Sequence, residues 1–147
     1  MKKIPYIEDF EQWKKEFHFF IPIKVRFSET DMYQHVNNVS AFIYFEEARI
    51  DFLQHIGFME EMAIHEGAVI VADLQCDYHR QMFFNEKLKV FVKTNSVGRT
   101  SFDLHYMTTN EKEEITLTGR GRVVFIDALT GKPKPLTESM KEKLKEK

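Results

Sequence analysis

The chain has 147 residues, of which 43% are apolar and 30% are charged, and its formal net charge at pH 7 is −2. This composition is typical of one folded domain with a sizeable core and excludes an intrinsically disordered chain. A slightly acidic balance supplies no positive field for nucleic acid, so we expect no nucleic-acid partner.

The sequence contains a single cysteine, Cys76, which cannot form a disulfide within the chain. No run of about 18 apolar residues is present, and the charged N-terminus lacks the apolar stretch of a secretion signal. We therefore expect a cytoplasmic protein with no membrane span. Cys76 lies in an alternating segment, which favours a small buried residue over a nucleophile.

Two elements are expected before the longest helix. Residues 7–17 carry aromatic side chains at helical spacing, which predicts a short amphipathic helix. Residues 21–27 alternate between apolar and other residues, which predicts a half-buried strand. Pro22 suits the beginning of that strand or a sheet edge.

The longest predicted helix spans residues 39–56, which contain no Gly or Pro. Gly57 follows directly, where a helix end favours a residue that is free to adopt positive φ. Apolar residues, Ile43 among them, cover most of the helix circumference and leave a narrow polar stripe. We therefore expect this helix to be almost completely buried. Residues 59–66 add one or two further turns.

After residue 67 the apolar period changes to two, which indicates strands. Residues 70–79 predict a long strand with Ile70, Ala72 and Leu74 on one face. Residues 87–93 and 102–106 then predict a hairpin.

The last predicted strand spans residues 114–127, where Gly119 and Gly121 share a face with apolar residues and leave room for a close neighbour. The Lys/Glu-rich tail at 137–147 contains too little apolar surface to dock firmly. One strand, a long helix and several successive strands predict a single α+β domain over residues 1–147. Its antiparallel sheet would wrap around the one long helix.

The segment ETDMYQHVNN, residues 29–38, places a carboxylate, an imidazole and two carboxamides directly before the long helix. With FEEAR at 45–49 and LQHIG at 53–57, it resembles the hot-dog-fold acyl thioesterases of the 4-hydroxybenzoyl-CoA thioesterase type. The resemblance continues in VGRTSF at 97–102 and DALTGKP at 127–133. It covers a core of about residues 20–136.

The resemblance implies a single hot-dog fold, in which about five antiparallel strands wrap around the central helix. It also implies that two protomers pair into a continuous sheet and hold pantetheine between them. Asp31 corresponds to the acidic residue of the family, and the backbone N–H near Asn38 to the donor that faces the thioester oxygen. His35 is expected to orient Asp31, to act as a base or to contact the pantetheine arm.

Thioester hydrolysis requires a nucleophile or an activated water, together with donors for the developing oxyanion. The start of a helix supplies such donors, and Asn37 or Asn38 is suited to cap it. Asp31 either attacks the carbonyl directly or activates water, and the sequence leaves both routes open. The structural alternative is that Asp31 only stabilises a turn.

Arg99, Thr100 and Ser101 follow Gly98 in a predicted turn and are candidates for binding the nucleotide phosphates of the substrate. The alternative is an ordinary hairpin turn. Glu46 and Arg49 have the spacing of an ion pair within the helix. The histidines lack metal-ligand spacing, and we expect neither a metal nor another cofactor.

The predicted function is that of an acyl-CoA thioesterase, which acts as a dimer or a tetramer. An acyl-carrier-protein thioesterase is the alternative enzyme, although Tyr33 stands where those enzymes carry asparagine. A non-catalytic module that binds acyl-CoA is the alternative from another class. The sequence specifies neither the acyl chain nor the oligomeric order.

Overall fold

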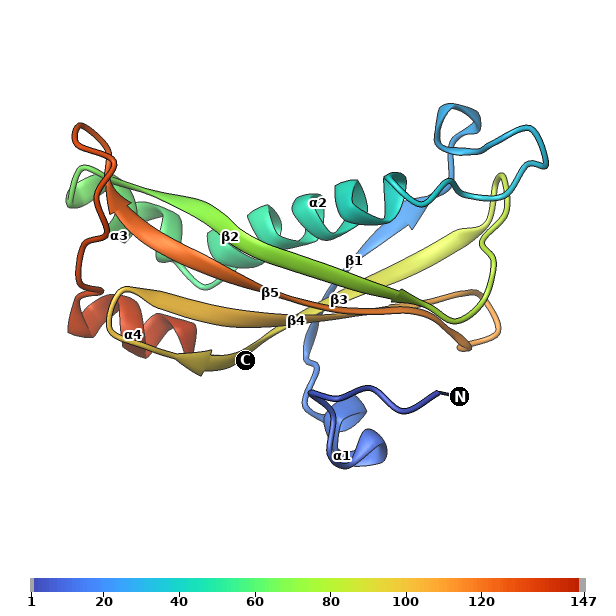
Figure 1. Cartoon of the computed structure of the whole chain (residues 1–147), viewed down its shortest axis with the longest axis horizontal. Coiled ribbons are helices and arrows are strands. Elements are labelled where there is room, and N and C mark those ends of the chain that lie inside the picture. Colours follow the sequence, from blue (N-terminus) through green and yellow to red (C-terminus); the bar gives the residue numbers. More distant parts are fainter. Residues whose placement is uncertain (1, 146–147) are drawn as a thin grey trace.

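The computed structural model describes residues 2–145, and these contain one antiparallel sheet of five strands (Figure 1). The strands are β1 (Phe19–Lys24), β2 (Gly67–Tyr78), β3 (Lys87–Val97), β4 (Ser101–Thr109) and β5 (Ile115–Asp127). Their order in the sheet is β1-β3-β4-β5-β2, so β1 and β2 form the edges. The predicted α+β architecture is therefore confirmed, and Pro22 lies in an edge strand as expected.

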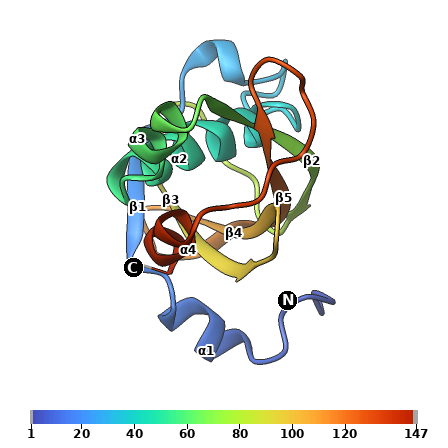
Figure 2. The ribbon, with the colours of Figure 1, turned by 90° about the vertical axis from the view of Figure 1, so that its left-hand side faces the viewer.

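The sheet curves around the long helix α2 (Ser40–His55), as Figure 2 shows. Gly57 adopts a φ of 82° and connects α2 to the short helix α3 (Phe58–Ile64), as predicted. The helix is less buried than expected, because it packs on the β1 and β3 side of the sheet. Ile43 and Ile50 on its other side remain 44% and 42% exposed.

Gly119 lies on the concave face of β5, directly beneath α2. A Cβ atom at this position would lie 2.5 Å from Cε2 of Phe45 and 2.9 Å from the Gln75 carbonyl oxygen. The Phe45 ring in turn stacks on Tyr106, with 4.5 Å between the ring centroids. The predicted close neighbour of the glycine is therefore the central helix itself.

Two strand predictions were wrong in detail because the backbone changes course. The first strand ends at Lys24, and Phe27 begins a 3₁₀ turn (Phe27–Glu29) in which its side chain is 67% exposed. In β2 the register with β5 skips Ala72, which forms a bulge. Ile70 therefore lies on the opposite face from Leu74, since a bulge shifts the side-chain alternation.

The prediction that the C-terminal tail does not dock was also wrong. Residues Glu138–Leu144 form helix α4, which begins after Thr137, whose hydroxyl accepts a hydrogen bond from the N–H of Met140. Met140 and Leu144 are four residues apart, so they share one face, and both are fully buried in the main core. The last two residues of the predicted tail, 146–147, lie outside the described part.

The N-terminal segment covers the convex face of the sheet. Helix α1 (Phe10–Lys15) lies inside the predicted range and places Trp13 in a second apolar cluster with Phe17 and Met107. The Trp13 indole N–H donates to Nδ1 of His105 over 2.9 Å. His105 belongs to a set of polar side chains on β4 and β5, in which Asp103 pairs with both His105 and Arg120.

Asp103 is the charged centre of that set, and it predicts a pH-dependent stability. Burial alone would raise the pKa of Asp103, but His105, whose Nε2 lies 3.3 Å from the carboxylate, and the hydrogen bond from Arg120 outweigh burial and lower it. We expect Asp103→Asn to lower the free energy of unfolding at pH 7 by about 2 kcal/mol. Because the folded pKa is depressed, this stabilisation is present above the unfolded pKa, about 3.9, and is lost as the pH falls through the folded pKa.

Urea denaturation of both proteins at pH 7 and below pH 4 would measure the effect. The difference in unfolding free energy should shrink at the lower pH. Asp9→Asn is the control, because Asp9 is exposed and only caps α1 through the N–H of Gln12. A difference for Asp103→Asn that is independent of pH would contradict the account.

Candidate active site

The segment that joins β1 to α2 forms a compact loop at one end of the sheet (Figure 1). Backbone hydrogen bonds fix this loop, because the N–H of Val36 donates to the Met82 carbonyl over 2.8 Å. The N–H of Asn37 likewise donates to the Glu29 carbonyl over 2.9 Å. Residues 29–38 therefore have a defined position next to the start of α2.

Asp31 is exposed, and one of its carboxylate oxygens is used within the loop. Oδ1 accepts hydrogen bonds from the backbone N–H groups of Tyr33 and His35, over 2.8 and 3.3 Å. The other oxygen, Oδ2, has no hydrogen-bond donor among residues 2–145. The turn-stabilising role considered for Asp31 is therefore present, and it leaves one oxygen free for chemistry.

His35 is close to Asp31 through its backbone. The His35 carbonyl accepts from the Asp31 N–H over 2.8 Å. The imidazole itself packs edge-on against Phe83, with 5.0 Å between the ring centroids. The structure thus brings the two predicted residues together, and within residues 2–145 the imidazole forms no hydrogen bond with the Asp31 carboxylate.

Asn37 and Asn38 have different roles at the start of α2. The Asn37 side chain accepts from the N–H groups of Val39 and Ser40, over 3.0 and 2.9 Å, and so it is the cap. The N–H of Asn38 has no acceptor within the described residues. A donor that is unpaired at the positive end of a helix is suited to bind a carbonyl oxygen.

Glu29 and Tyr44 support the loop, and sequence reasoning identified neither. The carboxylate of Glu29, which is only 7% exposed, accepts from the Arg26 N–H over 2.8 Å and from the Tyr44 hydroxyl over 3.0 Å. It thereby fastens the loop to α2. The three-residue spacing of Arg26 and Glu29 was visible in the sequence, whereas the contact with Tyr44 depends on the fold.

Tyr78 at the end of β2 is a further neighbour that the sequence did not reveal. Its hydroxyl donates to the Asn38 carbonyl. Burial raises the pKa of Tyr78 to about 12, so the hydroxyl stays protonated at neutral pH. A cavity of about 190 Å³ lies beside this contact and is lined by Val36 and residues 78–82.

Cys76 lies two residues before Tyr78 on β2 and is a poor nucleophile. Burial raises the pKa of its thiol to about 12, so it carries almost no thiolate at neutral pH. The half-buried thiol lies against the main core. This agrees with the interpretation of Cys76 as a small packing residue.

Arg99, Thr100 and Ser101 lie at the turn between β3 and β4, which is at the opposite end of the sheet from the loop between β1 and α2 (Figure 1). Ser101 is level with Ile70 near the start of β2, through Val124 of β5, whereas Asn38 contacts Tyr78 at its end. At about 3.3 Å per residue, Ile70 and Tyr78 are about 26 Å apart along β2. The structure therefore does not bring the two predicted groups together within one chain.

Comparison with known proteins identifies the family. The model of the thioesterase-like superfamily matches residues 25–144. The chain is 43% identical to the uncharacterized protein YsmA of Bacillus subtilis over 98% of this chain and 97% of that protein. It is 30% identical to the long-chain acyl-CoA thioesterase FadM of Escherichia coli over 84% and 95%.

A solved structure of a thioesterase from Thermus thermophilus, complexed with coenzyme A and Zn, is similar in fold. It superposes with a TM-score of 0.74 at 30% identity and covers 85% of this chain and 90% of that one. Within residues 2–145, every helix is too short or too polar to cross a membrane.

The family match, the identity to FadM and the similar solved structure lead to one conclusion. The chain belongs to the thioesterase-like superfamily and is a thioester hydrolase with the hot-dog fold.

Proposed function

We propose that the protein hydrolyses acyl-CoA, with Asp31 as the catalytic carboxylate and the Asn38 N–H as an oxyanion donor. The observation that carries this proposal is that one short loop presents both a free carboxylate oxygen and an unpaired N–H at the start of α2. The names of FadM and of the coenzyme A complex support coenzyme A as the carrier.

The proposed reaction has two routes. In one, Oδ2 of Asp31 attacks the thioester carbon and expels the thiolate of coenzyme A, and water then cleaves the mixed anhydride. In the other, Asp31 accepts a proton from water as the water attacks, and the proton passes to the leaving thiolate. In both routes the Asn38 N–H stabilises the oxyanion, a contribution of about 3 kcal/mol for one well-placed donor.

We further propose that a second copy of the chain completes the site. The cavity of about 190 Å³ lined by Val36 and residues 78–82 is smaller than the roughly 300–1,000 Å³ of typical ligand pockets. The β2 edge has no neighbouring strand within residues 2–145, and Val71 and Ile70 on it are exposed. Ile43 and Ile50, on the side of α2 that faces away from β1 and β3, are also exposed, as expected for a surface that a second copy covers.

Antiparallel pairing of two β2 edges would reverse the second sheet relative to the first. The start of one β2 would then lie beside the end of the other. Because Ser101 is level with the start of β2, residues 99–101 of the second copy would approach the Asp31 loop. In that position Arg99 is a candidate ligand for the nucleotide phosphates, and its guanidinium forms no ion pair within residues 2–145. A tetramer and a cytoplasmic location stay predictions.

An assay of thiol release would test the proposed function. The purified protein would be given acyl-CoA substrates of increasing chain length and the same acyl groups on acyl-carrier protein. We expect turnover of at least one acyl-CoA at a kcat/KM above that of the matching carrier-protein substrate. Tight binding of acyl-CoA without any released thiol would instead indicate a non-catalytic module.

A further inference from the structure

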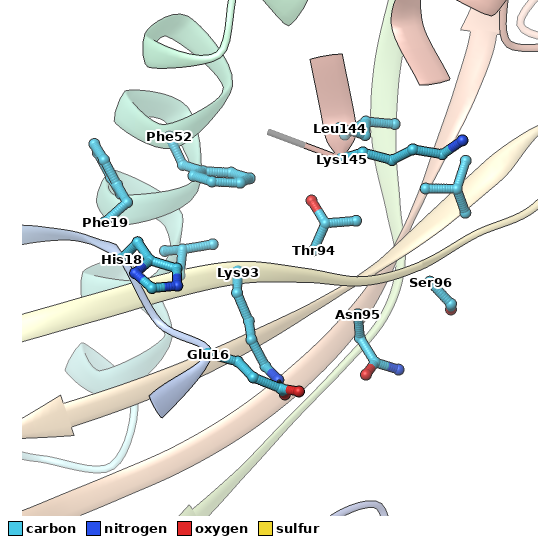
Figure 3. Close-up of a pocket in the computed structure, with 12 residues that line it drawn as sticks. Glu16, His18, Phe19, Phe52, Lys93, Thr94, Asn95, Ser96, Leu144 and Lys145 are labelled. Atoms are coloured by element: carbon cyan, nitrogen blue, oxygen red, sulfur yellow. Dashed lines mark hydrogen bonds and ion pairs between the residues drawn. The ribbon is translucent and has the colours of Figure 1, made fainter. Parts of the chain in front are cut away.

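A second cavity, of about 460 Å³, opens at the β1 edge of the sheet (Figure 3). Its volume lies within the roughly 300–1,000 Å³ of typical small-molecule sites. Phe52 of α2 lines it, twelve residues beyond the start of that helix at Ser40, which corresponds to about 18 Å along the helix axis. The cavity is therefore separate from the Asp31 loop.

The cavity exists because β1 is shorter than β3. The first residue of β1, Phe19, pairs with Val92, and the chain before it leaves the sheet toward α1 (Figure 1). The β3 edge from Lys93 to Val97 consequently has no paired strand on this side within residues 2–145. An uncovered edge presents backbone N–H donors and carbonyl acceptors.

The walls and the rim of the cavity differ in chemistry. Figure 3 shows the rings of Phe19 and Phe52 on one side and Leu144 of α4 across from them. Phe52 and Leu144 are buried, so both walls are apolar and fixed. The rim carries the exposed residue Asn95, the ammonium group of Lys145, which pairs with Glu142 over 3.7 Å, and the carboxylate of Glu16, which pairs with Lys93.

Thr94 breaks the apolar pattern of these walls. The preceding core-facing residues of β3 are Leu88, Val90 and Val92, and Thr94 continues the same alternation. Its Oγ1 is buried and has no hydrogen-bond partner within the described residues, and Figure 3 shows it at the cavity. Since buried hydroxyl groups nearly always have a partner, a ligand oxygen is a suitable acceptor for it.

We propose that this cavity is a second, non-catalytic site for an amphipathic carboxylate, namely a medium-chain fatty acid. The alkyl chain packs against Phe52 and Leu144. The carboxylate accepts hydrogen bonds from Thr94 and the open β3 edge, and Lys145 at the rim turns from its exposed ion pair with Glu142 to balance the ligand charge. The inference rests on the proposed function for the source of the ligand, because hydrolysis of an acyl-CoA releases such an acid.

Titration of the full chain with decanoate would test this inference. Backbone amide chemical shifts locate the bound acid, and calorimetry gives its affinity. We expect shifts at residues 92–97 and 144–145. Lys145→Glu and Thr94→Val should each weaken binding by about 3- to 10-fold, and decanol should bind more weakly than decanoate.

Lys141→Glu is the matched control, because Lys141 lies one turn before Lys145 and does not line the cavity. It pairs with Glu138 over 3.7 Å, three residues back, as Lys145 does with Glu142. It should leave the affinity unchanged. Shifts confined to residues 31–38, or equal affinity in both cavity variants and the control, would overturn the inference. Since binding is measured without turnover, decanoate bound here in a protein that cleaves no acyl-CoA would refute only the proposed function.

Discussion

Asp31→Asn is expected to lower kcat/KM for acyl-CoA hydrolysis by about 10²- to 10⁴-fold while the protein stays folded. The asparagine keeps an Oδ1 that can accept from the N–H groups of Tyr33 and His35, so the turn is retained. It loses the negative charge and the basicity that both proposed routes require. Thiol release measures the activity, and urea denaturation measures the stability of the same preparation.

Asp9→Asn is the matched control for this prediction. Asp9 also accepts a backbone N–H, that of Gln12, but it lies at the start of α1 on the other side of the sheet. The control should keep full activity. If Asp31→Asn retained the activity of the unmodified protein, the carboxylate at this position would have only the turn-stabilising role.

Gly119→Val is expected to have the largest effect on stability, a loss of about 3 kcal/mol in the free energy of unfolding. Its Cβ would meet both the Phe45 ring and the backbone carbonyl of Gln75, at 2.5 and 2.9 Å. Neither neighbour can move freely, because Phe45 is buried and stacked on Tyr106 while Gln75 belongs to β2. Urea denaturation would measure the loss.

A double-mutant cycle would identify the cause. Truncation of Phe45 to alanine removes the ring that the valine would meet, so the double variant should be more stable than the sum of the two single losses predicts. We expect a coupling of about 1 kcal/mol. Strict additivity would show that the ring does not restrict this position and that the glycine is required for another reason.

Much of the fold could be predicted from the sequence because local patterns reflect it directly. The absence of Gly and Pro before Gly57 located α2, and apolar alternation located β3, β4 and β5. The bulge at Ala72 was missed because it depends on the register with β5. The docking of α4 was missed because two apolar residues, Met140 and Leu144, are a weak signal in a charged segment.

The candidate site could be predicted only in part. The motif at 29–38 located the loop, and Asn37 was correctly considered as a cap of α2. The contacts of Glu29 with Tyr44 and of Tyr78 with Asn38 join residues far apart in the chain, so no local pattern reveals them. The distance between Asp31 and Arg99 likewise follows from the strand order, which was known only from the structure.

We propose that Asp31 and the Asn38 N–H face a thioester carbonyl between two copies of the chain. A crystal structure of Asp31→Asn with a bound acyl-CoA would reveal this arrangement. We expect the carbonyl oxygen about 3 Å from the Asn38 nitrogen, beside residue 31, with the nucleotide near residues 99–101 of the second copy. An acyl-CoA bound elsewhere, with residue 31 pointing into solvent away from any second copy, would rule the arrangement out.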